Sequence, residues 1–423
     1  MKLIVQASSL KGEVPVPASK SHTMRAVVIA SLAEGVSEIT GPLDSLDTRA
    51  CVEACRALGA AIDTGEVWKV EGTGGKVASP EDVIDVANSG TTIRFLLSAA
   101  ALAEGATVFT GDASIRKRPA GPLLEALTNL GAEAFSTRGN GCAPFVVRGP
   151  MTGGKTKLAA VSSQFLSSLL LSCPLAPDDT HIDVTELNEA PYVRMTLDWL
   201  SRRGIEYEEE ELRRFKIRGG QGYHGFQRQI PGDFSSATFF LVAGAVSADS
   251  ELTLLGLDMD DAQGDKEVVR MLADMGASVV ESSNEIRIGP GALRGGEFDL
   301  NATPDALPAM AVAATLARGE TRLVNVPQAR LKETDRIAVM ASELTRMGAQ
   351  VEELEDGLVI QGGKLSGAEL SGHDDHRVVM ALAVAGLAAE GETVIDTAES
   401  AAVTFPNFVE LMTSVGANMR TDE

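Results

Sequence analysis

A repeat of about 72 residues constrains the fold of this chain more than any other feature. Six stretches with the periodicity of an amphipathic helix each end in a glycine, which is followed by a strand-like run. The glycines are spaced by 72, 73, 72, 72 and 68 residues, at Gly59, Gly131, Gly204, Gly276, Gly348 and Gly416. Glycine adopts the left-handed backbone that closes a helix, where a Cβ atom would clash. The sequence therefore predicts six copies of one structural unit.

A second helix, apolar nearly all round, is predicted in each unit. The six runs are MRAVVIASLAEG, IRFLLSAAALAEG, QFLSSLLLSCPLA, ATFFLVAGAVSAD, LPAMAVAATLARG and RVVMALAVAGLAAEG. A helix without a polar face must be covered on most sides. Short alternating runs such as ATVFTG and TRLVNV indicate strands. We expect an α/β fold with buried helices, although periodicity does not say how the units divide between domains.

The charge of the chain argues against several classes of partner. It carries 37 basic and 59 acidic residues, a formal net charge of −22, and 4% aromatic residues. This balance disfavours nucleic acids and membrane surfaces bound by bulk charge, and the few aromatic residues disfavour stacking platforms for single strands. A local cluster of cations can still bind a small anion, because salt screens distant charges beyond about 10 Å.

The four cysteines lack the spacing of a metal site. Cys51 and Cys55 are one helical turn apart, which suits packing in a reducing compartment. The N-terminal apolar run is too short for a signal peptide, and no apolar stretch reaches the roughly 18 residues of a membrane span. We therefore expect a cytoplasmic protein without metal.

The residues that precede the six apolar helices differ from unit to unit. They read SKSHTMR, ANSGTTIR, VSSQ, PGDFSS, TPDALP and HDDHR. Helix capping by Ser, Thr, Asn or Asp is one explanation, and for PGDFSS and TPDALP it is as good as any other. Capping does not explain the cations Lys20, Arg25, Arg94, His376 and Arg377, because the helix dipole disfavours a cation there by about 0.3–1 kcal/mol. A bound anion relieves that conflict, so we expect a site for a polyanionic small molecule.

Two further motifs extend the cationic pattern. SIRKRP places Arg116, Lys117 and Arg118 ahead of a predicted helix, where a solvated basic turn is the alternative. LKETDR brings Lys332, Glu333 and Arg336 together, where a capped, charged helix start is the alternative. A carboxylate held between cations is also what proton transfer beside an anionic substrate requires.

The combined motifs resemble the 5-enolpyruvylshikimate-3-phosphate synthase family. They occur from about Pro15 to Phe408 in the family's order: SKSHTMR, NSGTTIR, RKRP, VSSQFL, GDFSSA, TPDALP, RLKETDR, DDHR and TFPNF. The resemblance implies a two-domain inside-out α/β barrel with six βαβαββ units, three in each domain. It implies a discontinuous domain of residues 1–18 plus 230–423 and an inserted domain of residues 19–229.

The resemblance implies transfer of the enolpyruvyl group of phosphoenolpyruvate to the 5-hydroxyl of shikimate 3-phosphate, with release of phosphate and without a metal or organic cofactor. Contacts to phosphoenolpyruvate would come from Lys20, Gly90, Arg118, Gln164, Arg336 and Arg377. Contacts to shikimate 3-phosphate would come from Lys20, Ser21, Arg25, Ser162, Ser163, Asp305, Gln328 and Lys332. Asn88 is expected to bind substrate as well.

By the same resemblance, four residues would act in catalysis. Glu333 would protonate the methylene carbon, and Asp305 would orient and deprotonate the 5-hydroxyl. Lys20 would serve the leaving phosphate, with His376 in support.

The sequence departs from the common family pattern at three positions. Val403 stands where many members have lysine, and Gln328 replaces an asparagine. Glu189 stands where a phosphate-binding serine is frequent, so we expect either a shifted loop or compensation by Arg194.

Three other functions remain as alternatives. A transferase acting on UDP-N-acetylglucosamine shares the fold but typically carries a cysteine in the loop that here reads SIRKRP, and no cysteine lies between Cys55 and Cys142. An RNA-end-processing enzyme would need a basic groove, and a non-catalytic scaffold would need interchangeable residues before its helices. We expect a monomer that binds small anions and neither nucleic acid nor membrane.

Overall fold

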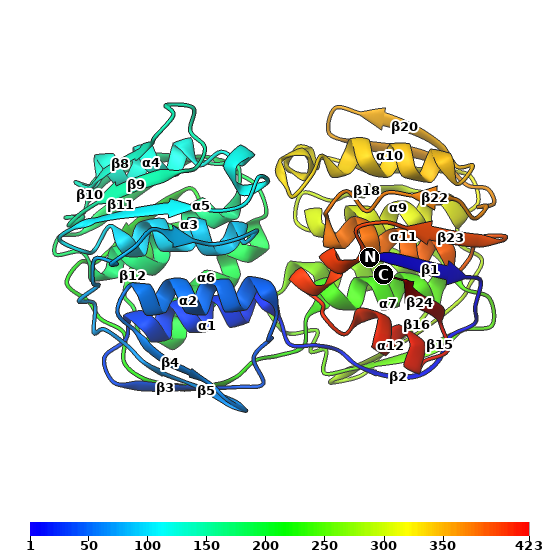
Figure 1. The fold of residues 1–423 in the computed structure, drawn as a ribbon, viewed down its shortest axis with the longest axis horizontal. Coiled ribbons are helices and arrows are strands. Elements are labelled where there is room, and N and C mark those ends of the chain that lie inside the picture. The colour runs from blue at the N-terminus through cyan, green and yellow to red at the C-terminus, as the bar shows by residue number, and fades with distance from the viewer. Residues whose placement is uncertain (423) are drawn as a thin grey trace. The chain divides into compact units, whose positions relative to one another are not determined.

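The computed structural model describes residues 1–422, which form two compact units (Figure 1). The first unit joins Met1–Ser19 to the chain from Pro231 onward, and the second unit is Lys20–Ile230. The predicted α/β fold is confirmed, because helices and strands alternate throughout both units. Among the described residues, no helix is long and apolar enough to cross a membrane.

Six apolar helices form the centres of the repeats. They are α1 (Lys20–Leu32), α3 (Gly90–Ala100), α5 (Ser163–Ser172), α7 (Phe234–Val246), α9 (Leu307–Leu316) and α11 (His376–Gly386). Nearly all of their residues are buried, as an apolar helix requires. In the second unit α3 packs against α1 and α5, and in the first unit α9 packs against α7 and α11. The prediction of buried helices is confirmed.

Six amphipathic helices complete the repeats. They are α2 (Leu46–Ala57), α4 (Gly121–Asn129), α6 (Ala190–Arg202), α8 (Glu267–Met275), α10 (Arg336–Arg346) and α12 (Phe408–Ser414). Each is followed by one of the six predicted glycines, and all six glycines have φ between 73° and 106°. The left-handed closure predicted from the 72-residue spacing is therefore confirmed.

The described strands form six four-stranded sheets, three in each unit. The second unit contains β3 (Val36–Thr40), β4 (Ala61–Thr64), β5 (Val67–Glu71), β6 (Ile84–Asp85), β7 (Ala106–Thr110), β8 (Glu133–Ser136), β9 (Phe145–Arg148), β10 (Gly154–Ala160), β11 (Thr180–Leu187), β12 (Tyr207–Glu210), β13 (Arg214–Ile217) and β14 (Gln227–Gln229). Their orders are β14-β3-β5-β4, β6-β7-β9-β8 and β10-β11-β13-β12, and in each sheet only the first pair is parallel.

The first unit repeats the same pattern. Its strands are β1 (Lys2–Gln6), β2 (Lys11–Pro15), β15 (Glu251–Leu255), β16 (Ser278–Glu281), β17 (Glu285–Gly289), β18 (Glu297–Asp299), β19 (Glu320–Val324), β20 (Gln350–Leu354), β21 (Gly357–Gln361), β22 (Glu369–Leu370), β23 (Glu392–Ile395) and β24 (Asn418–Asp422). Their orders are β16-β17-β15-β2, β18-β19-β21-β20 and β22-β23-β1-β24.

Three sheets take a strand from a distant part of the chain. β14 pairs in parallel with β3, and β2 pairs in parallel with β15. In these two sheets the other three strands lie far in sequence from β14 and from β2, respectively. β1 occupies the place between β23 and β24 that the last strand of a repeat fills in the other sheets. Lys2 pairs with Asp422, so both ends of the described chain lie side by side (Figure 1).

Short 3-10 helices place several residues of interest. They are η1 (Ile115–Lys117), η2 (Cys173–Leu175), η3 (Gly264–Lys266), η4 (Pro304–Ala306), η5 (Pro327–Leu331) and η6 (Ala398–Val403). Where the chain leaves and re-enters the first unit, Ala18 bridges Gly232 and the Ser19 amide donates to the Pro231 carbonyl at 2.8 Å.

Candidate active site

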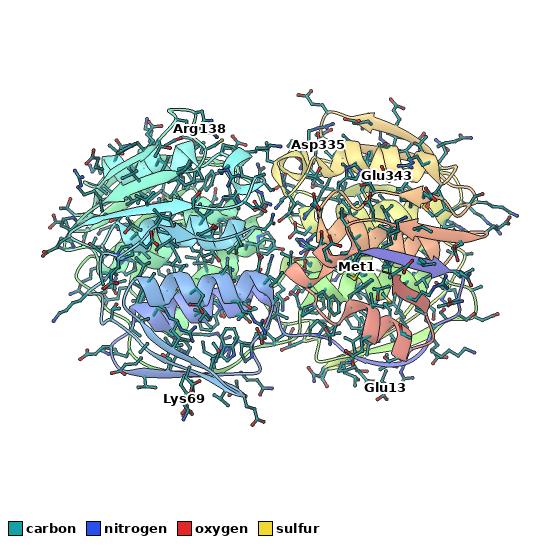
Figure 2. All side chains as sticks on the ribbon, viewed as in Figure 1. Met1, Glu13, Lys69, Arg138, Asp335 and Glu343 are labelled. Carbon is teal, nitrogen blue, oxygen red and sulfur yellow. The ribbon has the colours of Figure 1, made fainter. Side chains whose placement is uncertain are left out.

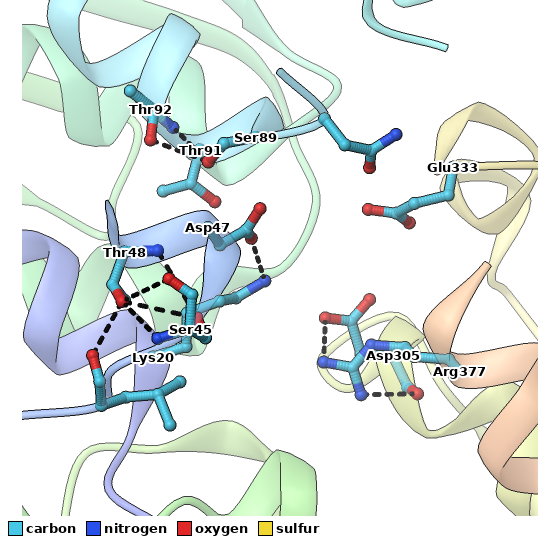
Figure 3. A network of polar contacts seen from close by, with 12 residues as sticks. Lys20, Ser45, Asp47, Thr48, Ser89, Thr91, Thr92, Asp305, Glu333 and Arg377 are labelled. Carbon is cyan, nitrogen blue, oxygen red and sulfur yellow. Dashed lines mark hydrogen bonds and ion pairs between the residues drawn. The ribbon is translucent and has the colours of Figure 1, made fainter. Parts of the chain in front are cut away.

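Lys20 begins α1 and is held by an acidic residue from the next helix. Its Nζ lies 3.0 Å from Oδ2 of Asp47, and both side chains are largely buried (Figure 3). Asp47 lies in the first turn of α2, which Ser45 and Thr48 cap reciprocally. Asp47 thus supplies a negative charge beside the cation that the helix dipole disfavours. Asp47 was not predicted from the sequence, although it follows closely on Ser45, a residue type that favours helix starts.

Arg25 is buried in the second turn of α1 among uncharged acceptors. Its guanidinium donates to Thr196 Oγ1 and to the carbonyls of Ser21 and Tyr192, each at 2.9 Å, and it lies over the Phe95 ring. Burial lowers the pKa of Arg25 below the ordinary arginine value. Since these acceptors are neutral, they hold the guanidinium in place without cancelling its charge.

Arg118 lies against the start of α3. It donates to Ser114 Oγ at 2.8 Å and to Asn88 Oδ1 at 3.3 Å, while Asn88 Nδ2 donates to Asp112 at 2.6 Å. A Cβ atom at Gly90 would lie 2.7 Å from one Arg118 nitrogen. Gly90 therefore allows the guanidinium to approach the first amides of α3, a favourable place for an anion.

Gln164 connects the starts of α3 and α5. Its Oε1 accepts from Arg94 at 2.6 Å, and its Nε2 donates to Thr91 Oγ1 at 3.0 Å. Arg94 also lies over the ring of Phe165. The polar groups at the starts of the apolar helices of two different repeats therefore lie together, as we expected for an anion site.

The start of α5 already carries a carboxylate. Ser162 caps the helix, and both the amide and the hydroxyl of Ser163 donate to Glu189 Oε2, at 3.1 and 2.7 Å. Glu189 is buried and has a left-handed backbone (φ 58°). Arg194 is exposed. The donors of Ser163 thus stabilise the buried carboxylate of Glu189.

In the first unit, Arg336 gathers three carboxylates. Its guanidinium donates to Asp375 at 2.8 and 3.2 Å, to Asp305 at 2.8 Å and to Glu333. Although burial alone would lower the pKa of Arg336, the charges of Asp375, Glu333 and Asp305 outweigh it and raise that pKa. Arg336, Asp305 and Glu333 were predicted from the sequence, whereas Asp375, which lies within the DDHR motif, was not.

Asp305 is surrounded by cations. Besides Arg336, it is contacted by Lys332 at 3.6 Å and by Arg377, whose Nη2 lies 3.1 Å from Oδ2 (Figure 3). Arg377 also donates to the Asp305 carbonyl at 3.4 Å. Three cationic side chains therefore surround the carboxylate of Asp305.

Three other expected residues lie in the same unit. His376 is the first residue of α11 and is buried, directly after the capping residue Asp375. Gln328 in η5 donates to the Asn301 carbonyl at 3.1 Å, while its buried Oε1 has no hydrogen-bond partner. Val403 ends η6, is half-buried and contributes no charge.

The two units therefore offer different chemistry. The second unit presents cations, hydroxyls and amides at helix starts, which suit phosphate or carboxylate groups. The first unit presents carboxylates packed against three cations, which suits proton transfer beside an anion. Among the described residues, no group of three or more His, Cys, Asp or Glu side chains could hold a metal ion.

Comparison with known proteins supports one interpretation of these features. Residues 4–412 match the family model described as EPSP synthase (3-phosphoshikimate 1-carboxyvinyltransferase). The chain is 57% identical to the 3-phosphoshikimate 1-carboxyvinyltransferase of Acetivibrio thermocellus, over 100% of both chains. It is 48% identical to the 3-phosphoshikimate 1-carboxyvinyltransferase of Methanocella arvoryzae, over 98% of this chain and 99% of that protein.

Solved structures agree with the fold. EPSP synthase from Acinetobacter baumannii superimposes with a TM-score of 0.84 at 28% identity, covering 100% of both chains. The enolpyruvyl transferase NikO from Streptomyces tendae superimposes with a TM-score of 0.81 at 20% identity, over 99% of this chain and 98% of that one. The expected two-domain α/β fold of the enolpyruvyl transferases is thereby confirmed.

Proposed function

The chain belongs to the EPSP synthase family and catalyses the 3-phosphoshikimate 1-carboxyvinyltransferase reaction, and from that premise we propose which residues carry each step. The reaction transfers the enolpyruvyl group of phosphoenolpyruvate to the 5-hydroxyl of shikimate 3-phosphate and releases phosphate. The alternatives that act on UDP-N-acetylglucosamine or on RNA ends lack this support from relatives at 57% identity.

The cluster around Arg336 is the observation that carries the proposal. Arg336 and Arg377 bind the anionic groups of phosphoenolpyruvate, and Asp305 holds the shikimate ligand beside them, helped by Lys332 and Gln328. A guanidinium with a fixed, buried geometry suits a carboxylate or phosphate because it offers several parallel N–H donors.

Glu333 and Asp305 perform the two proton transfers in this proposal. Arg336 holds Glu333 as a carboxylate. An anionic substrate on Arg336 takes the place of Glu333 there, and the released Glu333 delivers a proton to the methylene carbon. Asp305 accepts the proton of the 5-hydroxyl as the hydroxyl oxygen attacks the resulting cationic carbon, which gives a tetrahedral intermediate. Phosphate then leaves this intermediate while Glu333 takes a proton back from the methyl carbon, so that the enol double bond re-forms.

The second unit binds the phosphate and carboxylate groups in this proposal. Lys20 stabilises the leaving phosphate, with His376 of the first unit in support, and Asp47 fixes the position of the ammonium. The other contacts come from Ser21, Arg25, Asn88, Gly90, Arg118, Ser162, Ser163 and Gln164. Every step uses protein acids, bases and cations, so we propose that no cofactor takes part.

We further propose a monomeric, cytoplasmic enzyme whose domains are residues 1–18 plus 230–423 and residues 19–229. Four free cysteines, three of them buried, support a reducing compartment.

Phosphate release from phosphoenolpyruvate tests the substrate assignment. We expect release with shikimate 3-phosphate as the acceptor and none with UDP-N-acetylglucosamine. Release with UDP-N-acetylglucosamine alone, or with neither acceptor, would contradict the assignment.

A further inference from the structure

We propose that Glu343 is a positioning residue, which fixes the loop of residues 371–374 and thereby sets Asp375 against Arg336. Glu343 lies on α10 (Figure 2) and is only 2% exposed. None of the proposed substrate contacts includes it. The inference rests on the proposed role of Arg336 and Arg377 in binding phosphoenolpyruvate.

The carboxylate of Glu343 is directed at the loop. Its Oε2 accepts from the Ser371 amide at 3.1 Å, and its Oε1 lies 3.1 Å from Nε2 of His373. A third partner, Arg346, reaches Oε2 at 3.2 Å from the same helix and does not belong to the loop. A buried carboxylate needs such partners, since an unpaired one is strongly destabilising.

One helix holds this loop at two points. Arg336 and Glu343 are seven residues apart on α10, which is about two turns, so their side chains leave the same face. Arg336 binds Asp375 through both of its carboxylate oxygens, while Glu343 binds Ser371 and His373. The distance between the two points on α10 therefore dictates the path of the segment between Ser371 and Asp375.

The backbone of this segment is strained, so neighbouring residues must hold it in place. His373 and Asp374 are consecutive non-glycine residues with left-handed backbones, at φ 52° and 55°. Such conformations persist only where the surroundings enforce them. Glu343 acts on one side of the loop, and on the other Asp396 accepts from the Gly372 amide at 2.9 Å and Thr397 from the Asp374 amide at 3.2 Å.

Gly372 shows how closely the loop is packed. A Cβ atom there would lie 2.3 Å from a methyl carbon of Val379 on α11. The loop thus lies directly against the helix whose first residues are His376 and Arg377. A loop released from Glu343 relaxes toward ordinary backbone angles, and Asp375 moves with it, which alters the placement of both Arg336 and Arg377.

Steady-state kinetics with both substrates varied tests the proposal. We expect Glu343→Ala to raise the KM for phosphoenolpyruvate by about tenfold or more, because a misplacement of about 1 Å can cost about 100-fold. The KM for shikimate 3-phosphate should rise by a clearly smaller factor, because Lys332 still contacts Asp305. Glu343→Gln should restore most of the activity, since its amide oxygen still accepts from the Ser371 amide.

Two further variants separate positioning from stability. Arg346→Ala removes a Glu343 contact outside the loop and should leave both KM values within about twofold of wild type. His373→Gly removes the ring contact and leaves the loop free to change its path, because glycine adopts left-handed and right-handed backbones about equally readily. It should therefore raise the KM for phosphoenolpyruvate with a smaller loss of Tm than Glu343→Ala, because Ser371 and Arg346 still contact the Glu343 carboxylate. This readout stands even where Glu343→Ala does not fold.

The outcomes distinguish this inference from the proposed function. Asp375→Asn in the same assay tests the Arg336 cluster itself, and an unchanged KM for phosphoenolpyruvate there would contradict the proposed function. If Asp375→Asn raises that KM but Glu343→Ala and His373→Gly do not, the positioning role of Glu343 is wrong. An equal rise of both KM values in Glu343→Ala would likewise overturn it.

Discussion

Asp375 holds Arg336 with both carboxylate oxygens, at 2.8 and 3.2 Å, and neither side chain is more than 1% exposed. The same carboxylate caps α11 by accepting from the Arg377 amide at 2.8 Å. One buried group therefore fixes a side chain of α10 and the start of α11 together. Removing one partner of such a pair leaves an uncompensated buried charge.

Asp375→Ala should lower the free energy of unfolding by about 3 kcal/mol, the smallest loss expected when a buried ion pair is broken. The loss should be no larger because Asp305 and Glu333 still contact Arg336. Urea denaturation measures this change. Asp44→Ala is the matched control, since its pair with Arg49 is exposed and should contribute less than about 1 kcal/mol. Equal losses in the two variants would show that burial does not matter at Asp375.

Glu333→Gln and Asp305→Ala should abolish turnover, because each removes a group that transfers a proton in the proposed mechanism. Binding of shikimate 3-phosphate should remain measurable by calorimetry, since other contacts to it remain. Exposed Glu352→Gln serves as the control and should keep full activity. Near-wild-type turnover in Glu333→Gln or in Asp305→Ala would show that the corresponding assignment is wrong.

Glu189→Ser should lower the KM for shikimate 3-phosphate by up to about tenfold, because a hydrogen bond to a charged group is worth about 1.5 kcal/mol and Ser163 now gives two to Glu189. Those donors would become available to the substrate phosphate. The exposed residue Glu186, changed to serine, is the control. A higher KM in Glu189→Ser would mean that the carboxylate is needed to hold the start of α5.

Only one of the four thiols should react quickly in the folded protein. Cys142 is half-exposed, whereas Cys51, Cys55 and Cys173 are buried. Burial raises the pKa of Cys173 to about 12, so a rise from pH 8 to pH 10 should not activate it. Labelling with a thiol reagent should count one group in the native state and four in denaturant. Rapid native labelling of two or more would contradict the described burial.

The repeat could be predicted from the sequence because it depends on local signals. Each helix closure needs a residue without a Cβ, so Gly59 and its five counterparts mark the ends of helices directly. The burial of α7 follows in the same way from the absence of polar residues along it. Neither inference needs knowledge of a distant contact.

Contacts between distant residues could not be predicted in this way. Asp375 and Arg336 are 39 positions apart, and the residues around each of them do not indicate that the two form a pair. Glu189 was recognised as unusual, but its bond to Ser163 depends on the left-handed turn before α6. Local signals do not reveal the pairings of β1, β2 and β14 either, because their partners lie far away in sequence, and only the family resemblance indicated a discontinuous domain.

Because β1 pairs with β24, the first and the last strand of the described chain are neighbours in one sheet. Lys2 and Asp422 are antiparallel neighbours, so a short turn could join them and convert β24 and β1 into an ordinary hairpin. The sixth repeat would then be continuous, like the other copies that keep their own last two strands. Circular permutants that join these two strands and are opened at an exposed loop should therefore still find the same fold.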